Sequence, residues 1–306
     1  MSDAIATGDK PARRRRGAAL AAGALILGLL LAAGGAAPWI VPHPPDEQDL
    51  ARRLEGPGGA HPLGRDDLGR DVLSRLLYGA RISLPLAIVV VGLSAGLGTL
   101  LGGLAGLAGG AIDAALMAAA DLLLAFPGIL LAVAIVAVRG PGLANLGVAL
   151  GVIGWVGYAR LARGETLRVV REPFVEAARA AGAGPARLLG RHLLPLVARP
   201  AAVQAALGVG GVVLAEAGLS FLGLGVPPPV ATWGGMLRDG AQNLLDAPRL
   251  AIAPGALIAL AVLGAQLLGE GLGGAPESAG AEDADRRTGA GAGSARGSVG
   301  AGRGRA

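Results

Sequence analysis

Long apolar runs alternate with short polar segments over most of the chain. The apolar runs cover residues 18–40, 82–107, 113–138, 143–159, 201–222 and 250–268. Most of them approach or exceed the roughly 20 residues that a helix needs to cross the hydrocarbon core of a bilayer. The pattern therefore predicts an all-α integral membrane protein with six transmembrane helices.

The first apolar run allows two interpretations. Residues 1–17 are polar and end in the basic stretch from Arg13 to Arg16, and residues 32–37 are all small. A cleaved secretory signal has such a basic start and such a cleavage site. The run at 18–40 is nevertheless long enough to span a membrane, and further spans follow it. We favour an uncleaved first transmembrane helix at 18–40, preceded by a cytoplasmic tail at 1–17.

Composition argues against several other classes of protein. The chain is 53% hydrophobic and 16% charged, whereas soluble domains carry about 25% charged residues. It has no cysteine, and its three histidines are scattered without the spacing of metal ligands, so we expect no disulfide and no metal site. The net charge of +5 lies in loops and termini beside the apolar runs. Such charge is typical of membrane topology rather than of a nucleic-acid partner.

Two long polar segments interrupt the apolar pattern. Residues 160–200 contain eight arginines, and residues 41–81 contain six arginines together with seven acidic residues. Arginine and lysine near span ends remain on the cytoplasmic side, which places residues 160–200 in the cytoplasm. With the N-terminus inside, residues 41–81 form an extracytoplasmic loop, although their arginines strain the rule. Six spans then leave both termini in the cytoplasm.

The extracytoplasmic loop ends in an amphipathic pattern. Apolar side chains recur at helical spacing at Leu68, Val72, Leu73, Leu76 and Leu77, with charged residues between them. This pattern predicts a helix that lies at the membrane interface before the second span. We assign no chemistry to it.

The segment 160–200 predicts a folded structure rather than a slack loop. Residues 176–181 favour a helix, Gly182 interrupts it, and Pro185 can open a second helix that Pro195 ends. The result is a helix–turn–helix that stands out from the bilayer, a shape suited to docking a soluble partner.

Elsewhere, Pro127 should break the third span, and the Gly-, Ala- and Arg-rich tail at 274–306 should be disordered.

Acidic residues at membrane depth are functional candidates by default. Glu216 is the first candidate and Asp121 the second. Glu216 could form hydrogen bonds inside the helix bundle and fix helix register, or it could contact a cationic group of a substrate, such as a peptide amino terminus or a metal ion. Asp121 lies near the inner end of its span, which favours the structural interpretation there.

Motifs for covalent chemistry are missing. The phosphate-binding loop G-x-x-x-x-G-K-[ST] needs a lysine, and the only lysine is Lys10, outside such a context. The H-E-x-x-H and G-x-S-x-G motifs are absent as well. We therefore expect no catalytic residue and no ATPase activity in this chain. An ion-coupled secondary transporter is the alternative, but it needs coupling acids and usually inverted repeats; only Glu216 and Asp121 support it.

Several stretches resemble a known family. E-A-A-R-A-A-G at 176–182, followed by R-H-L-L-P at 191–195, resembles the "EAA" loop of permeases of binding-protein-dependent ABC importers. The segments 61–84, 121–127 (D-L-L-L-A-F-P) and 219–229 (L-S-F-L-G-L-G-V-P-P-P) are similar to the dipeptide, oligopeptide and nickel branch, in particular its C-type subunit. The resemblance covers about residues 61–273.

The resemblance implies a type I ABC importer permease fold, with a core permease domain at 82–273. It implies one half of a translocation path for peptides or a related small solute such as nickel, in the bacterial inner membrane. The implied partners are a second permease subunit in a heterodimer, two cytoplasmic ABC ATPase subunits and an extracytoplasmic solute-binding protein. ATP and magnesium would be bound by the ATPase, and no cofactor by this chain.

The same resemblance assigns ATPase coupling to the loop at 160–200. Glu176 would pair with a basic group of the ATPase, Ala177 and Ala178 would permit close approach, Gly182 would turn the chain, and Pro195 closes the motif. Members of the branch often have an arginine where this chain has Ala118, so the resemblance supplies no neighbouring partner for Asp121.

Overall fold

A computed structural model describes residues 9–273 of the chain, and side chains from Arg14 onward. The expectation of disorder for 274–306, and the first residues of the expected tail at 1–17, lie outside the described residues. Within residues 9–273 the named elements are all helical, and one isolated bridge joins Arg65 and Asp71.

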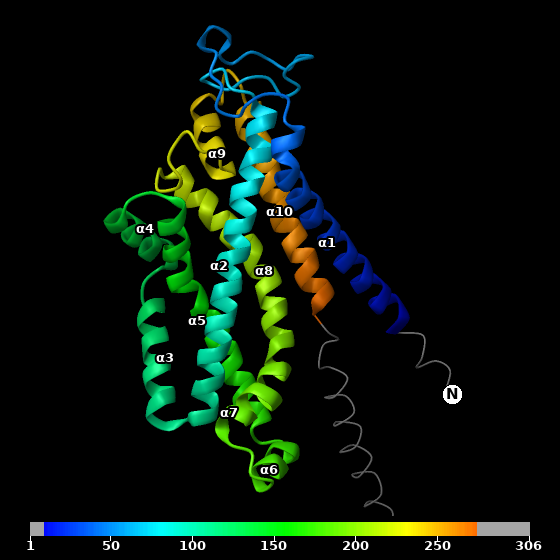
Figure 1. The fold of residues 1–306 in the computed structure, drawn as a ribbon, viewed down its shortest axis with the longest axis vertical. Coiled ribbons are helices and arrows are strands. Elements are labelled where there is room, and N and C mark those ends of the chain that lie inside the picture. The colour runs from blue at the N-terminus through cyan, green and yellow to red at the C-terminus, as the bar shows by residue number, and fades with distance from the viewer. Residues whose placement is uncertain (1–8, 274–306) are drawn as a thin grey trace, which may run out of the picture. The chain divides into compact units, whose positions relative to one another are not determined.

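Within the described residues, five helices are long and apolar enough to cross a membrane, and the number is six if a bent pair of helices is counted as one span (Figure 1). The five are α1 (Asp9–Ile40), α2 (Val72–Ala108), α5 (Leu143–Val169), α8 (Leu194–Phe221) and α10 (Arg249–Leu272). The pair consists of α3 (Gly110–Leu124) and α4 (Gly128–Arg139), which meet at an angle of 84°. The prediction of an all-α membrane protein is thereby confirmed. The break falls at Pro127, as expected, because proline lacks a backbone N–H and cannot continue the hydrogen-bond ladder.

The separate interfacial helix expected before the second span is not present. Residues from Val72 onward are instead the first turns of α2. Asp71 caps this helix, since its carboxylate accepts a hydrogen bond from the Ser74 N–H at 2.7 Å. The apolar face of the expected helix is buried in the protein: Val72 and Leu76 are 1% and 4% exposed. Intramolecular packing therefore replaces the membrane surface that the sequence pattern suggested.

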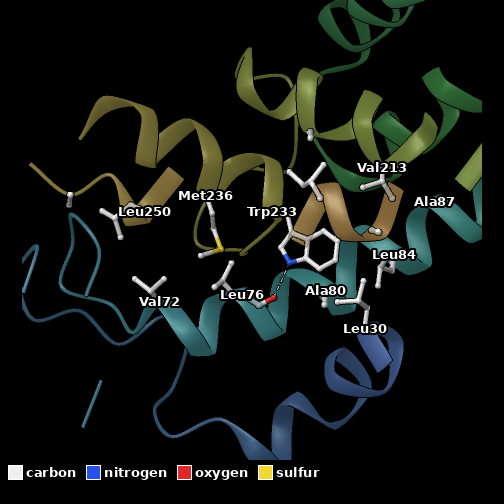
Figure 2. Close-up of a cluster of buried hydrophobic side chains, with 14 residues drawn as sticks. Leu30, Val72, Leu76, Ala80, Leu84, Ala87, Val213, Trp233, Met236 and Leu250 are labelled. Atoms are coloured by element: carbon white, nitrogen blue, oxygen red, sulfur yellow. Dashed lines mark hydrogen bonds between the residues drawn. The ribbon is translucent and has the colours of Figure 1, made fainter. Parts of the chain in front are cut away.

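Helix α9 (Trp233–Gln242) covers that apolar face. Its first residue, Trp233, is fully buried, and its indole N–H donates a hydrogen bond to the Leu76 carbonyl oxygen at 3.0 Å (Figure 2). The Thr232 hydroxyl caps the helix by accepting a hydrogen bond from the Gly235 N–H. Trp233 thus joins α9 to α2 and anchors a cluster that extends to α1, α8 and α10. The cluster consists of Leu30, Val72, Leu76, Ala80, Leu84, Ala87, Val213, Ala217, Trp233, Met236, Ala247, Leu250, Ile258 and Ala261.

Small residues set the distance between neighbouring helices. A Cβ atom placed on Gly102 of α2 would lie 2.0 Å from the Ala159 carbonyl oxygen of α5, and one on Gly98 would lie 2.3 Å from the Trp155 carbonyl oxygen. Close backbone approach at glycine is the usual way in which membrane helices gain contact area. The α2–α5 pair is therefore packed backbone against backbone at these two glycines.

The α1–α2 connection (residues 41–71) folds over the end of the bundle where α9 lies (Figure 1). It includes a short 3₁₀ helix, η1 (Leu50–Arg52). Arg249 of α10 donates hydrogen bonds to the Leu54 and Glu55 carbonyl oxygens, both at 2.9 Å. Arg70 makes an ion pair with Asp66 at 2.6 Å and lies 4.0 Å from Asp239 of α9. This connection is therefore a folded layer, held to α9 and α10 by polar contacts.

Candidate functional site

The α5–α8 connection (residues 170–193) lies at the other end of the bundle from α9 (Figure 1). Helix α5 continues to Val169, past the end predicted for its span, and α6 (Pro173–Ala180) follows. Proline at the first position of α6 fits because its missing N–H is not needed there. Gly182 has a φ of +85°, which L-residues with a Cβ rarely adopt. The predicted helix and glycine turn are thus both present.

The second predicted helix does not end at Pro195, and this expectation was wrong. Helix α7 (Pro185–Arg187) passes through a π-helical segment, η2 (Leu188–Leu193), directly into α8. The Leu194 N–H bonds to the Leu189 carbonyl oxygen, five residues back. Pro195 occupies the first turn of α8, where a missing N–H is tolerated. The fifth span therefore begins at Leu194 and is continuous with the second helix of the connection.

Helix α6 is buried on one face and exposed on the other. Val175 is fully buried and packs in a cluster with Val169, Leu188, Leu189 and Leu193. The coupling residues expected from the sequence lie on the surface: Glu176, Ala177, Gly182 and Pro195 are exposed, and Ala178 is half-buried. The arrangement brings α6 against η2, which runs directly into α8, while leaving an exposed face that includes Phe174, Glu176 and Ala177 free for contact.

Glu216 lies at a junction of three helices. Its carboxylate is 99% buried and accepts hydrogen bonds from the Ser220 hydroxyl of α8 at 2.8 Å and from the Ser83 hydroxyl of α2 at 3.2 Å. The Ser83 hydroxyl oxygen in turn accepts a hydrogen bond from the backbone N–H of Trp233, the first residue of α9, at 3.4 Å. These contacts are what the hydrogen-bonding interpretation of Glu216 requires. They leave no open side of the carboxylate toward a solute.

Asp121 is exposed and forms an ion pair with Arg160 of α5. A second pair lies on the same two helices, where Arg163 Nε and Nη2 donate to the two Asp113 oxygens at 2.5 and 2.6 Å. Both pairs connect α3 to the end of α5 from which the α5–α8 connection departs. Sequence reasoning missed them because the partners are 39 and 50 residues apart, and no local spacing reports such a contact.

A groove with a volume of about 880 Å³ runs along α2 and α5. Apart from Ser94, its walls are apolar from Ile82 to Leu97 on α2 and from Leu143 to Val152 on α5, and Trp155 lies among its lining residues. Within the described part of the chain, Arg81 is the only charged residue that lines it. Sequence reasoning did not identify this groove, since neither helix is unusual on its own. Among residues 9–273, no group of three or more acidic or histidine side chains is placed to hold a metal ion.

Comparison with known proteins agrees with this architecture. The family described as "Binding-protein-dependent transport system inner membrane component" matches residues 98–274. The glutathione transport system permease protein GsiD of Pectobacterium atrosepticum is 43% identical over 84% of this chain and 86% of its own length. The dipeptide transport system permease protein DppC of Alkalihalophilus pseudofirmus is 42% identical over 74% of each chain.

A third relative is the probable D,D-dipeptide transport system permease protein DdpC of Escherichia coli, which is 39% identical over 77% of this chain and 79% of its own. The family match, the sequence identity to these relatives and the set of membrane-capable helices all indicate the same kind of protein. The chain therefore belongs to the inner-membrane permease components of binding-protein-dependent ABC importers, and it is a multi-pass transport subunit rather than an enzyme or an ion-coupled carrier.

Proposed function

We propose that this chain forms one half of the translocation path of an ABC importer for small peptides, and that a second permease subunit forms the other half. The relatives described above are named for glutathione, dipeptides and D,D-dipeptides, and this supports a peptide rather than nickel as the solute. An extracytoplasmic binding protein would deliver the peptide to the end of the bundle that carries α9.

We further propose that two ATPase subunits supply the energy and that this chain docks one of them through α6. The observation that carries this proposal is that α6 is buried on one face and exposed on the other. Its inner face is fixed by Val175 against η2, the segment that runs directly into α8, and its outer face presents Ala177 and Glu176. A movement imposed on α6 would be passed to α8 through a continuous helix from Pro185 to Phe221. The importer would then alternate between two states that ATP binding biases.

The charges at the α6 end support a cytoplasmic location for it. Arg171, Arg179, Arg187 and Arg191 are all exposed there, and exposed arginines near span ends favour the cytoplasmic side. With six spans, both termini would then lie in the cytoplasm as well. ATP and Mg²⁺ would be held by the ATPase subunits, because this sequence has no phosphate-binding loop; we propose that this chain binds no cofactor.

The docking proposal is tested by affinity purification of the tagged permease in mild detergent. A Glu176→Lys, Gly182→Leu double variant alters the exposed face and the turn of α6. We expect the parent protein to retain a P-loop ATPase and a second permease, and the variant to lose only the ATPase. The matched control is Glu47→Lys, Gly58→Leu in the α1–α2 connection, where both residues are exposed and a side chain at Gly58 meets no atom within 4 Å.

Two results would contradict the proposal. A parent protein that purifies alone and still transports solute would make the chain a self-sufficient carrier. A double variant that retains the ATPase as well as the control does would remove α6 as the docking site. Separately, a Glu216→Gln variant that assembles normally and takes up every tested solute at the parental rate would exclude a contact between Glu216 and a cationic group of the solute.

A further inference from the structure

Arg81 lies in α2 at the boundary between a polar and an apolar part of the helix. The helix begins at Val72, so Arg81 lies about 13 Å along its axis. Before Arg81, α2 packs against α9 and the α1–α2 connection; after Arg81, the residues that α2 contributes to the groove are almost entirely apolar. The guanidinium group is therefore placed at the end of the groove nearest to α9.

Arg81 has no counter-charge among the residues that the structure describes. It is exposed and forms no ion pair or hydrogen bond with them, whereas Arg75, six positions earlier on α2, is 4% exposed and lies within 4 Å of Asp66 and Asp46. The backbones of α1 and α2 are in close contact at this point, because a Cβ atom on Gly34 of α1 would lie 2.8 Å from the backbone nitrogen of Arg81. An unpaired cation in a membrane helix is a functional candidate by default.

We propose that the groove along α2 and α5 is this subunit's wall of the solute path, and that Arg81 binds a carboxylate group of the solute there. This proposal rests on the proposed function and names the chemical class of its substrate, a small peptide with a free carboxylate. Among the described residues no acidic side chain lines the groove, so the groove itself supplies no negative charge to complement Arg81. A divalent metal cation would be repelled.

The chemistry of the groove suits solutes that share a backbone but differ in side chains. Its volume of about 880 Å³ lies within the roughly 300–1,000 Å³ of small-molecule sites. An apolar wall discriminates little among side chains, whereas a guanidinium group pairs with a carboxylate through two parallel hydrogen bonds. Recognition would thus fall on the group that all peptides with a free C-terminus carry.

The first test measures uptake by the complete importer reconstituted in liposomes, with glutathione and alanyl-alanine as radiolabelled probes. We expect Arg81→Gln to reduce the uptake rate per assembled complex about tenfold or more, because it removes a charged hydrogen bond. Arg81→Lys should restore part of the rate, since the positive charge returns. The matched control is Arg15→Gln: Arg15 is exposed on α1 and lines none of the groove, and its variant should transport as the parent does.

Uptake by Arg81→Gln at the parental rate would overturn the inference and leave the proposed function intact. A parent importer that takes up neither probe would instead overturn the proposed function. The two failures are therefore distinguishable. Equal losses in Arg81→Gln and Arg81→Lys would show that the positive charge contributes nothing to uptake, which would also overturn the inference.

The second test asks whether water reaches the groove. The chain has no cysteine, so Val89→Cys gives a single thiol on the groove wall, and Leu263→Cys on α10 gives a control thiol of similar exposure outside it. We expect water-soluble thiol reagents to label Val89→Cys in at least one nucleotide state and not to label Leu263→Cys. Protection of both thiols would show that lipid or a partner covers the groove, and would overturn the inference.

Charged reagents add a readout of Arg81 itself. Arg81 and Val89 are about 12 Å apart along the helix. At low ionic strength, Arg81→Gln should lower the ratio of the labelling rates of an anionic and a cationic thiosulfonate at Val89→Cys by about threefold. An unchanged ratio would mean that Arg81 does not face the same water-filled space, and this result would also overturn the inference.

Discussion

Two arginine-rich connections lie at opposite ends of the helix bundle, and the protein uses their charges differently. At the α9 end, Arg70 and Arg75 are each 4% exposed and are paired with carboxylates, the closest being Asp66 at 2.6 Å from Arg70. At the α6 end, Arg187 and Arg191 are exposed, and they form no ion pair with the residues that the structure describes.

The difference teaches that the number of arginines is a poor guide to the charge that a membrane protein presents. The six arginines of residues 41–81 are more than the positive-inside rule leads one to expect in an extracytoplasmic loop, and seven acidic residues accompany them. In the folded α1–α2 connection many of these charges neutralise one another: Arg65, for example, lies 3.2 Å from Asp49 and 3.4 Å from Glu55. Unpaired positive charge is concentrated at the α6 end, which is the side that the rule places in the cytoplasm.

The largest expected effect comes from breaking the buried charge cluster. Asp66→Asn removes the negative charge that lies between Arg70 and Arg75, both nearly buried. Arg70 keeps Asp67 at 3.5 Å and Asp239 at 4.0 Å, and Arg75 keeps the exposed Asp46 at 3.6 Å, but each loses its closest carboxylate. Breaking a buried ion pair costs about 3 kcal/mol of stability. We expect a loss of that size in the free energy of unfolding of the detergent-purified protein, followed by the fluorescence of the buried Trp233.

The control for this variant is Asp46→Asn. Asp46 also contacts Arg75, at 3.6 Å, but its side chain is 54% exposed, and exposed ion pairs contribute about 0–1 kcal/mol. A loss that is equally large in both variants, or absent in both, would show that the cluster is not the buried, mutually dependent unit that its geometry indicates.

The second effect concerns the cap of α2 and depends on pH. Burial alone would raise the pKa of the Asp71 carboxyl, but hydrogen bonds from the Ser74 N–H and from His61 outweigh it and lower the pKa below its usual 3.8. A lowered pKa means that this contribution to stability is complete above about pH 4 and is lost as the pH falls through the folded value.

Asp71→Ala should therefore cost about 1–2 kcal/mol near neutral pH through loss of the cap. Asp71→Asn should retain most of the cap, because asparagine is an equally good N-cap residue, and should flatten the acid limb of a plot of unfolding free energy against pH. An Asp71→Asn protein that loses stability below pH 4 as steeply as the parent would assign the acid sensitivity to other carboxyls.

The spans could be predicted from the sequence because burial in lipid needs only composition and length, as the run at 82–107 within α2 illustrates. Features that depend on tertiary contact could not. Helix α9 begins with Trp233 followed by Gly234 and Gly235, which are poor helix formers, and burial of the indole against Leu76, a tertiary contact, stabilises it. The partner of Asp121 could not be predicted from its position in the sequence, because Arg160 belongs to another helix.

The same distinction applies to the candidate site. A helix at 176–181 and the turn at Gly182 could be predicted because helix propensity and glycine act locally, although α6 begins earlier, at Pro173. The role of Pro195 could not, since the π-helical segment before it shifts the hydrogen-bond ladder and lets the helix continue. The groove with Arg81 needs two helices that lie more than 40 residues apart in sequence, and no pattern on either one reports it.

A third, smaller effect tests the turn after α6. Gly182 has a φ of +85°, and no atom lies within 4 Å of the position that a Cβ would take. Gly182→Ala should therefore cost about 1 kcal/mol through backbone strain alone, seen as faster hydrogen exchange of the α6 amides. Gly182→Asn should cost less, because asparagine tolerates this conformation better. Equal exchange rates in the two variants would place the strain elsewhere.

The smallest effect completes the comparison at the α6 end. Arg187 and Arg191 make no ion pair within residues 9–273, so an Arg187→Gln, Arg191→Gln double variant should change the free energy of unfolding by no more than about 0.5 kcal/mol, measured by the same fluorescence assay as Asp66→Asn. A loss above about 1 kcal/mol would show that these arginines stabilise the fold. An unchanged stability would mean that their charge acts on what surrounds the protein, whereas the charge at the α9 end acts on the protein itself.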